Sequence, residues 1–371
     1  MSEKKREVNY ELLRIVAMLM IVTVHYLSKG NVLKPLSDAE LNGADKAAWF
    51  VEALCMGCVD LYILISGYFG CRSKFRLSKV MCLWGCTIFY SVGITVILGI
   101  CGMVPIGGNY VSLTQMSVYD WVNVVFPVTT EEYWFITSYI IFYLISPFIN
   151  AGIEKLDKKN FGRILVILIV ILSVAKSILP VKIPFDRCGY DVLWFICLYL
   201  LGAYIKIHGF PLMKRPVLSL FLSIGSATLS WGISLVARYI YISRGSLGFY
   251  VETNPFYNLN FVLMMSNAVC LFCFFSCVRI QSVGLSKFIT TVSGCTLGVY
   301  LIHEQLYFKY VWTDLSGASD YASTWKFIPH MILTVLAVFI LCVVIEFVRK
   351  KITNAIVNHC PRIQHDGGRK A

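Results

Sequence analysis

Charged residues are scarce in this 371-residue sequence. Asp, Glu, Lys and Arg together make up 15% of the chain, whereas an average soluble protein contains about 25%. Hydrophobic residues account for 57%, and they are gathered into blocks of about 18–25 residues, the length that crosses a bilayer as a helix. This composition excludes an ordinary soluble globular protein and predicts an all-α, polytopic bundle of membrane helices.

Several motifs of energy-coupled proteins are missing as well. The sequence has no glycine-rich phosphate loop and no dinucleotide fingerprint, so an ATP-driven pump is disfavoured. It also has no internal repeat and no Gly/Pro-broken spans in matching positions, which are features typical of secondary transporters. The first apolar stretch lacks a small-residue cleavage site, so we expect a retained span rather than a cleaved signal peptide.

Acidic residues are fewer than basic ones, 21 against 33, which gives a net charge of +12. In a membrane protein this excess is typical of the positive-inside rule, and we expect no nucleic-acid partner. With the N-terminus in the cytoplasm, about 22 Lys and Arg residues lie inside and about 10 outside, so both chain ends are predicted to be cytoplasmic. A membrane domain, 1–351, is expected to precede a short polar cytoplasmic tail, 352–371. The ten predicted spans cover residues 11–28, 47–70, 80–103, 131–150, 161–180, 191–207, 216–242, 257–278, 289–312 and 326–348.

The fourteen cysteines do not form a convincing metal site. Cys55 and Cys58 form a C-x-x-C pair, and Cys270 and Cys273 repeat the spacing, but both pairs lie within predicted spans. No histidine or carboxylate completes a ligand set beside either pair. We therefore expect these thiols to behave as small hydrophobes, with no metal and no permanently bound cofactor.

Two ionisable residues, Arg14 and His25, interrupt the first span. They are eleven residues apart, so on a helix they differ by about 20° around the axis and lie about 16 Å apart along it. An arginine in hydrocarbon costs at least about 2.5–3.5 kcal/mol, so the pair predicts a functional site. The alternatives are a snorkelling arginine and a histidine that only hydrogen-bonds a neighbouring helix.

Other intramembrane ionisable residues extend this prediction. Asp60 lies near the middle of the second span and needs a partner or a proton, for which Arg14 or His25 is a candidate. His303 and Glu304 lie in the outer half of the ninth span, the same half as His25. The alternatives are a structural ion pair or a neutral Asp60, and a packing role for His303.

Glu346 lies near the cytoplasmic end of the last span. Lys and Arg residues three and four positions further on can reach it across one helical turn. We expect Glu346 to pair with Arg349 or Lys350 rather than to take part in catalysis.

Four segments, in order, resemble the acyltransferase family 3 membrane proteins. Arg14, ten intervening residues and His25 are similar to the family's hallmark in its first span. The Ser-Gly-Tyr ending at Tyr68, the Trp134–Pro147 segment and the Tyr-Leu-Ile-His ending at His303 are similar to later family segments. The resemblance implies a multi-pass enzyme of the bacterial cytoplasmic membrane that transfers an acyl group, commonly acetyl from acetyl-CoA, to a hydroxyl group.

The resemblance also implies roles for particular residues. Arg14 would hold the phosphopantetheine end of the donor or polarise its thioester carbonyl. His25 would act as general base on the acceptor hydroxyl, with Asp60 or Glu304 orienting it. Direct transfer and an acyl-histidine intermediate both remain open. The implied catalytic residues are His25, Arg14, Asp60 and His303; the donor-binding residues are Arg14, Arg72, Lys74 and Arg76; the acceptor-side residues are Glu131, Trp134, Tyr139 and Glu304.

Simpler explanations exist for two of these groups. The basic loop from Arg72 to Lys79 has the charge expected for binding CoA phosphates, but it is equally typical of the positive-inside rule. Trp134 and Tyr139 are also typical of an interfacial aromatic belt.

The predicted function is therefore a membrane O-acyltransferase that uses acyl-CoA as co-substrate and modifies a cell-surface or exported polysaccharide. The first rival is a transporter or flippase for a small molecule or a lipid-linked glycan. The second is a non-catalytic membrane partner or sensor in an envelope assembly. The sequence specifies neither the acceptor nor the acyl group.

Overall fold

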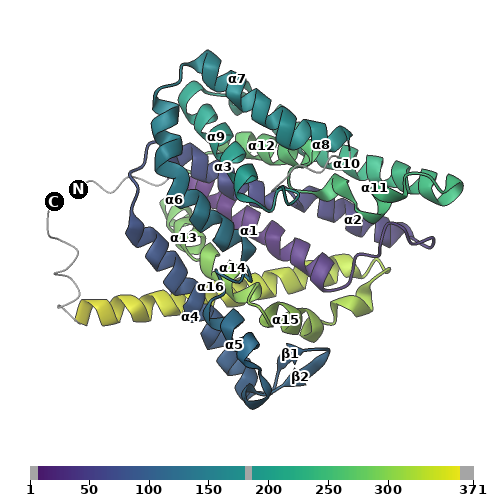
Figure 1. Cartoon of the computed structure of the whole chain (residues 1–371), viewed down its shortest axis with the longest axis vertical. Coiled ribbons are helices and arrows are strands. Elements are labelled where there is room, and N and C mark those ends of the chain that lie inside the picture. Colours follow the sequence, from purple (N-terminus) through teal and green to yellow (C-terminus); the bar gives the residue numbers. More distant parts are fainter. Residues whose placement is uncertain (1–6, 180–185, 360–371) are drawn as a thin grey trace.

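The computed structural model describes residues 7–179 and 186–359, and nearly all of its regular structure is helical. Figure 1 shows a bundle in which α1 begins and α16 ends at the same side of the molecule. The helices are α1 (Val8–Lys29), α2 (Gly43–Cys55), α3 (Cys58–Gly70), α4 (Leu77–Ile100), α5 (Val118–Val125), α6 (Trp134–Glu154), α7 (Lys158–Ile169), α8 (Ala175–Ile178), α9 (Val192–His208), α10 (Pro216–Arg244), α11 (Gly248–Glu252), α12 (Val262–Cys277), α13 (Val283–Gly294), α14 (Thr296–His303), α15 (Phe308–Ser316) and α16 (Phe327–His359).

The membrane spans confirm the predicted fold class. Within the described residues, nine helical stretches are long and apolar enough to cross a membrane, and α9 is a tenth, shorter apolar helix of 17 residues. Each predicted span corresponds to one of these ten stretches. The chain is therefore a polytopic all-α membrane protein.

Helix α1 lies at the centre of the bundle, where it contacts α3, α12, α13, α14 and α16. Of its apolar stretch, 56% is buried inside the protein, against 28% for α16. Since the remaining surface of α16 is long and strongly apolar, this helix is suited to face lipid. The central position of α1 places its polar residues inside the bundle.

Glycines allow α3 and α9 to approach closely. A Cβ atom added to Gly67 would lie 2.2 Å from the carbonyl oxygen of Tyr199, and one added to Gly202 would lie 2.4 Å from that of Leu64. Small residues at helix interfaces let backbones pack closely in membranes. The glycine of the Ser-Gly-Tyr segment therefore has a packing role.

The ninth span differs from its predicted boundaries of 289–312. It runs from Val283 to His303 through α13 and α14, and α15 is a separate helix. The chain turns after His303 because the Gln305 side chain accepts hydrogen bonds from the backbone N–H groups of Tyr307 (2.9 Å) and Phe308 (2.8 Å). These bonds satisfy N–H groups at the start of α15 that would otherwise lack a partner.

The loop between α4 and α6 contains a small hairpin that the sequence did not predict. Strands β1 (Val104–Ile106) and β2 (Asn109–Val111) pair antiparallel, with Val104 opposite Val111. Gly107 and Gly108 both have positive φ values, 60° and 80°, as a tight two-residue hairpin turn requires. The hairpin and α5 lie at one end of the bundle in Figure 1.

The first residues of the predicted polar tail, 352–371, are helical, because α16 continues to His359. Residues 352–359 carry no glycine or proline that would end the helix. Residues 360–371 lie outside the described part of the chain.

Candidate active site

A cavity of about 310 Å³ lies inside the bundle, beside α1. Arg14, Met18, Ile21 and His25 line it from α1, and their spacing puts all four on one face of the helix. Arg14 and His25, which the sequence predicts to share one helix face, therefore line the same internal cavity. The remaining lining residues come from α3, α4, α6 and the start of α14: Val59, Tyr62, Ser66, Leu83, Trp134, Phe135, Ile136, Tyr139, Thr296, Leu297 and Tyr300.

Arg14 is held at one end of this cavity by Glu11. Arg14 Nη1 donates to Glu11 Oε1 at 2.5 Å, and the Ser293 hydroxyl donates to the other oxygen of the same buried carboxylate. One turn separates Glu11 from Arg14 on the same helix face. The guanidinium has five N–H donors, so most of them remain for a bound anion or carbonyl.

His25 lies at the other end, within a cluster at the junction of α1 and α14. Its Nδ1 atom is 3.0 Å from His303 Nε2 and 3.1 Å from Glu304 Oε2. Lys29, one turn beyond His25, forms an ion pair with Glu304. The predicted proximity of His25, His303 and Glu304 is therefore observed.

The hydrogen bonds of His303 define which nitrogen of His25 carries a proton. His303 Nδ1 is 2.6 Å from the Val299 carbonyl oxygen, which can only accept, so Nδ1 is protonated. In neutral His303, Nε2 is then an acceptor, and His25 Nδ1 must donate to it. This leaves the lone pair on His25 Nε2, which takes part in no hydrogen bond among the described residues. His25 can accept a proton from a group in the cavity.

The same cluster is a possible metal site by spacing alone. One ligand atom each from His25, His303 and Glu304 lie within 4.8 Å of one another. However, the Lys29 ammonium already occupies the carboxylate, and His303 Nε2 accepts from His25. A divalent cation there would be repelled by Lys29. The arrangement fits a hydrogen-bonded relay better than a metal centre.

The family comparison agrees with this geometry. The family described as an acyltransferase domain matches residues 7–347, nearly the whole chain. The chain belongs to acyltransferase family 3. No curated protein and no solved structure matches it. This acyltransferase family 3 chain is thus a membrane acyltransferase, and its internal cavity is the candidate active site.

Asp60 takes a different place from the one predicted. Asp60 Oδ1 accepts from Trp194 Nε1 at 3.0 Å, and Asp60 pairs with neither Arg14 nor His25. Val59, Tyr62 and Ser66 line the cavity from one face of α3. Asp60 is turned by about 100° from Val59, which directs it toward α9. In this acyltransferase family 3 chain, Asp60 links two helices behind the site.

The predicted acceptor-side residues separate into two groups. Trp134 and Tyr139 line the cavity, and Glu304 belongs to the His25 cluster. Glu131 instead forms an exposed ion pair with Arg187, at 2.6 Å. Outside the spans, its neighbour Glu132 has a pKa raised by burial, an effect that the nearby Lys309 opposes.

A smaller cavity of about 130 Å³ extends the site along α4 and α6. It shares Leu83 and Tyr139 with the main cavity and reaches Lys79. The rings of Tyr139 and Tyr143 stack with centroids 6.3 Å apart beside the smaller cavity. The two cavities therefore lie next to each other between Lys79, at the start of α4, and the centre of the bundle. We call the row of space from Lys79 to Tyr139 the track.

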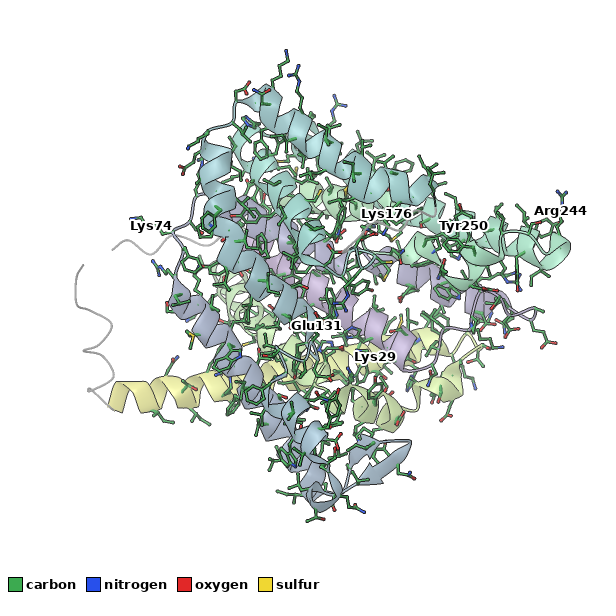
Figure 2. The ribbon with its side chains drawn as sticks, in the orientation of Figure 1. Lys29, Lys74, Glu131, Lys176, Arg244 and Tyr250 are labelled. Carbon is green, nitrogen blue, oxygen red and sulfur yellow. The ribbon has the colours of Figure 1, made fainter. Side chains whose placement is uncertain are left out.

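The predicted donor-binding residues of this loop differ in position. The backbone N–H of Arg76 donates to the Tyr143 hydroxyl at 3.3 Å, which fixes the loop at the inner end of the track. Arg72 and Lys74 are exposed and line neither cavity. Figure 2 shows Lys74 at the edge where α1 begins and Lys29 toward the other end of α1. Lys79 is therefore better placed than Arg72 or Lys74 to meet a ligand in the track.

Sequence reasoning missed three polar residues of the site. Glu11 and Lys29 continue the helix face of Arg14 and His25 by one turn at each end, so helical spacing was a sufficient signal for both. Tyr300 was noted only as part of a motif. Its hydroxyl is buried at the cavity, and its O–H donates to no acceptor among the described residues. No sequence signal distinguishes such a tyrosine from a packed one.

Proposed function

We propose that this acyltransferase transfers acetyl from cytoplasmic acetyl-CoA to a hydroxyl of a cell-surface or exported polysaccharide. The observation that carries the proposal is the free Nε2 lone pair of His25 beside a cavity that also holds Arg14. A positioned imidazole of this kind is a general base for a hydroxyl group. The enzyme is proposed to act in a bacterial cytoplasmic membrane, with both chain ends inside.

The reaction assigns a distinct task to each end of the cavity. His25 Nε2 takes the proton of the acceptor hydroxyl, while the hydroxyl oxygen forms a bond to the thioester carbonyl carbon. The carbon–sulfur bond then breaks, and the proton passes from His25 to the departing thiolate. The products are an ester and free CoA, so no further reactant is needed.

Arg14 is assigned to the donor rather than to the reacting carbonyl. It lies about 16 Å from His25 along the helix axis, and hydrogen bonds need heavy atoms about 3 Å apart. The Arg14 side chain is also bonded to Glu11, one turn further from His25, so a carbonyl beside His25 Nε2 lies closer to the His25 cluster than to the guanidinium. The guanidinium is suited to hold the pantetheine arm or its phosphate, while CoA enters through the track that ends at Lys79.

Tyr300 is the candidate for stabilising the charge that develops on the carbonyl oxygen. Its ring centroid lies 6.2 Å from that of His303, and its buried hydroxyl is a donor without a partner among the described residues. A donor that is already in place stabilises a transition state without reorganisation. Direct transfer needs only these groups.

The experiment is acyl transfer from radiolabelled acetyl-CoA by membranes that contain equal amounts of each variant. We expect label in surface glycan with the wild type, and loss of the label in His25→Ala and Arg14→Ala. Arg244→Ala, at the exposed end of α10, is the matched control and should keep full activity. Undiminished transfer by both site variants would overturn the assigned site. No label with the wild type would overturn the acetyl donor or the glycan acceptor and favour the transporter.

A further inference from the structure

A groove of about 750 Å³ lies between α7 and α9. None of its lining residues lines either cavity of the active site. Figure 1 shows α7 along the outer edge of the bundle. The lining residues are Lys158, Lys159, Gly162, Arg163, Val166, Ile167 and Tyr204.

One end of the groove carries three cations without an acidic partner. Lys158, Lys159 and Arg163 are exposed and form no ion pair among the described residues. The nearby Asp157 carboxylate caps α7 by accepting from the Asn160 backbone N–H. The charge of the groove is therefore left for an external anion.

The other end is apolar and follows directly from the same helix face. Val166 and Ile167 continue, two turns further on, the rows that start at Lys158 and Lys159. Their exposed fractions are 58% and 56%, and since α7 belongs to a candidate membrane span, these side chains are suited to contact lipid. The groove thus changes from cationic to apolar along the direction in which a lipid changes from headgroup to acyl chain.

Gly162 makes room between these two ends. A Cβ atom added there would lie 3.6 Å from the Tyr204 hydroxyl, which forms the facing wall. Tyr204 makes no hydrogen bond through this hydroxyl among the described residues. A Cβ atom would make an ordinary contact there, and a side chain that extends beyond Cβ would enter the groove.

We infer that this groove binds one anionic phospholipid of the inner leaflet, such as phosphatidylglycerol. Lys158, Lys159 and Arg163 bind the phosphate, and an acyl chain lies along Val166 and Ile167 past Gly162. Positive-inside topology brings the cationic end to the inner membrane surface, where anionic headgroups are found. Since the apolar half would be unused by a soluble anion, the lipid fits the whole groove better than free phosphate does.

The test is lipid binding by the purified full chain in neutral detergent, measured by titration and native mass spectrometry. The probes are dioleoylphosphatidylglycerol, dioleoylphosphatidylcholine and the soluble headgroup glycerophosphoglycerol. In the triple variant Lys158→Gln/Lys159→Gln/Arg163→Gln, we expect phosphatidylglycerol affinity to fall about a hundredfold. The control triple variant, Lys214→Gln/Arg215→Gln/Lys287→Gln, removes the same number of exposed charges outside the groove and should bind like the wild type.

Gly162→Leu tests the site without changing its charge. The leucine side chain should weaken phosphatidylglycerol binding by obstructing the groove. This variant still tests the proposal if the triple variant fails to fold. Equal binding of the two lipids by the wild type, or equal phosphatidylglycerol binding by wild type and both groove variants, would overturn the proposal. Equal affinity for glycerophosphoglycerol would also overturn it, since the groove would then be a simple anion site. The readout does not depend on acyl transfer.

Discussion

His25 Nδ1 lies 3.0 Å from His303 Nε2, and the carbonyl of Val299 fixes the proton on the far side of His303. His303 therefore positions His25 without touching a substrate in the cavity. His303→Ala should lower kcat about tenfold, the loss expected for one hydrogen bond. His25→Ala should lower it about 10²–10⁴-fold. Initial rates at saturating acetyl-CoA measure both effects.

Two controls separate positioning by His303 from general damage to the fold. His303→Gln supplies an acceptor and should restore part of the rate. Glu304 Oε2 lies 3.1 Å from the same Nδ1 atom of His25 and can take over as acceptor when His303 is removed, so His303→Ala/Glu304→Gln should cost more than the single changes combined. An identical kcat in wild type and His303→Ala would contradict this role.

Tyr300→Phe should separate activity from stability. The change removes a buried hydroxyl whose O–H donates to no acceptor among the described residues, so the midpoint of thermal unfolding should change little. If the hydroxyl stabilises the reacting carbonyl oxygen, kcat should fall about 10²–10³-fold with little change in KM. Tyr257→Phe is the control, because its hydroxyl donates to the Trp49 carbonyl at 3.3 Å. It should lower stability and leave kcat unchanged; an unchanged kcat in Tyr300→Phe would exclude its catalytic role.

The parts of this site that lie on one helix were predictable from the sequence. Helical spacing alone aligns Arg14 with His25, and the same rule would have added Glu11 and Lys29. Glu346 was likewise predicted to pair with Arg349, and Arg349 donates to it at 2.7 Å. Local geometry is set by the backbone, so sequence spacing is enough.

Features that depend on how helices pack were not predictable in the same way. The partner of Asp60 is Trp194, 134 positions away, and only the close approach of α3 and α9 brings the two together. The separate roles of Lys79 and Lys74 likewise depend on which side of the loop faces α6. A single sequence shows which residues are costly in a membrane, but the packing decides what each of them meets.

Gly67→Ala should destabilise the protein strongly. The added methyl group would lie 2.2 Å from the backbone oxygen of Tyr199, so α3 and α9 must separate. Overpacking of this kind costs about 1–3 kcal/mol. Gly85→Ala, where a Cβ atom meets nothing within 4 Å, should be neutral or slightly stabilising. The measurement is the midpoint of thermal unfolding of each variant, monitored by size-exclusion chromatography. Equal midpoints for Gly67→Ala and Gly85→Ala would show that the α3–α9 contact is looser than described.

Lys79, in the first turn of α4, should control donor binding more than Arg72 and Lys74 of the α3–α4 loop. Lys79 lines the smaller cavity, whereas Arg72 and Lys74 line neither cavity. A hydrogen bond to a charged group contributes about 1.5–3 kcal/mol, so Lys79→Gln should raise the KM for acetyl-CoA about tenfold or more and leave kcat nearly unchanged. Arg72→Gln/Lys74→Gln removes two charges and should raise KM less, by an amount that salt suppresses. If the double variant instead has the larger effect, the donor phosphates bind at the loop surface, and the track between Lys79 and Tyr139 is not the route by which acetyl-CoA reaches His25.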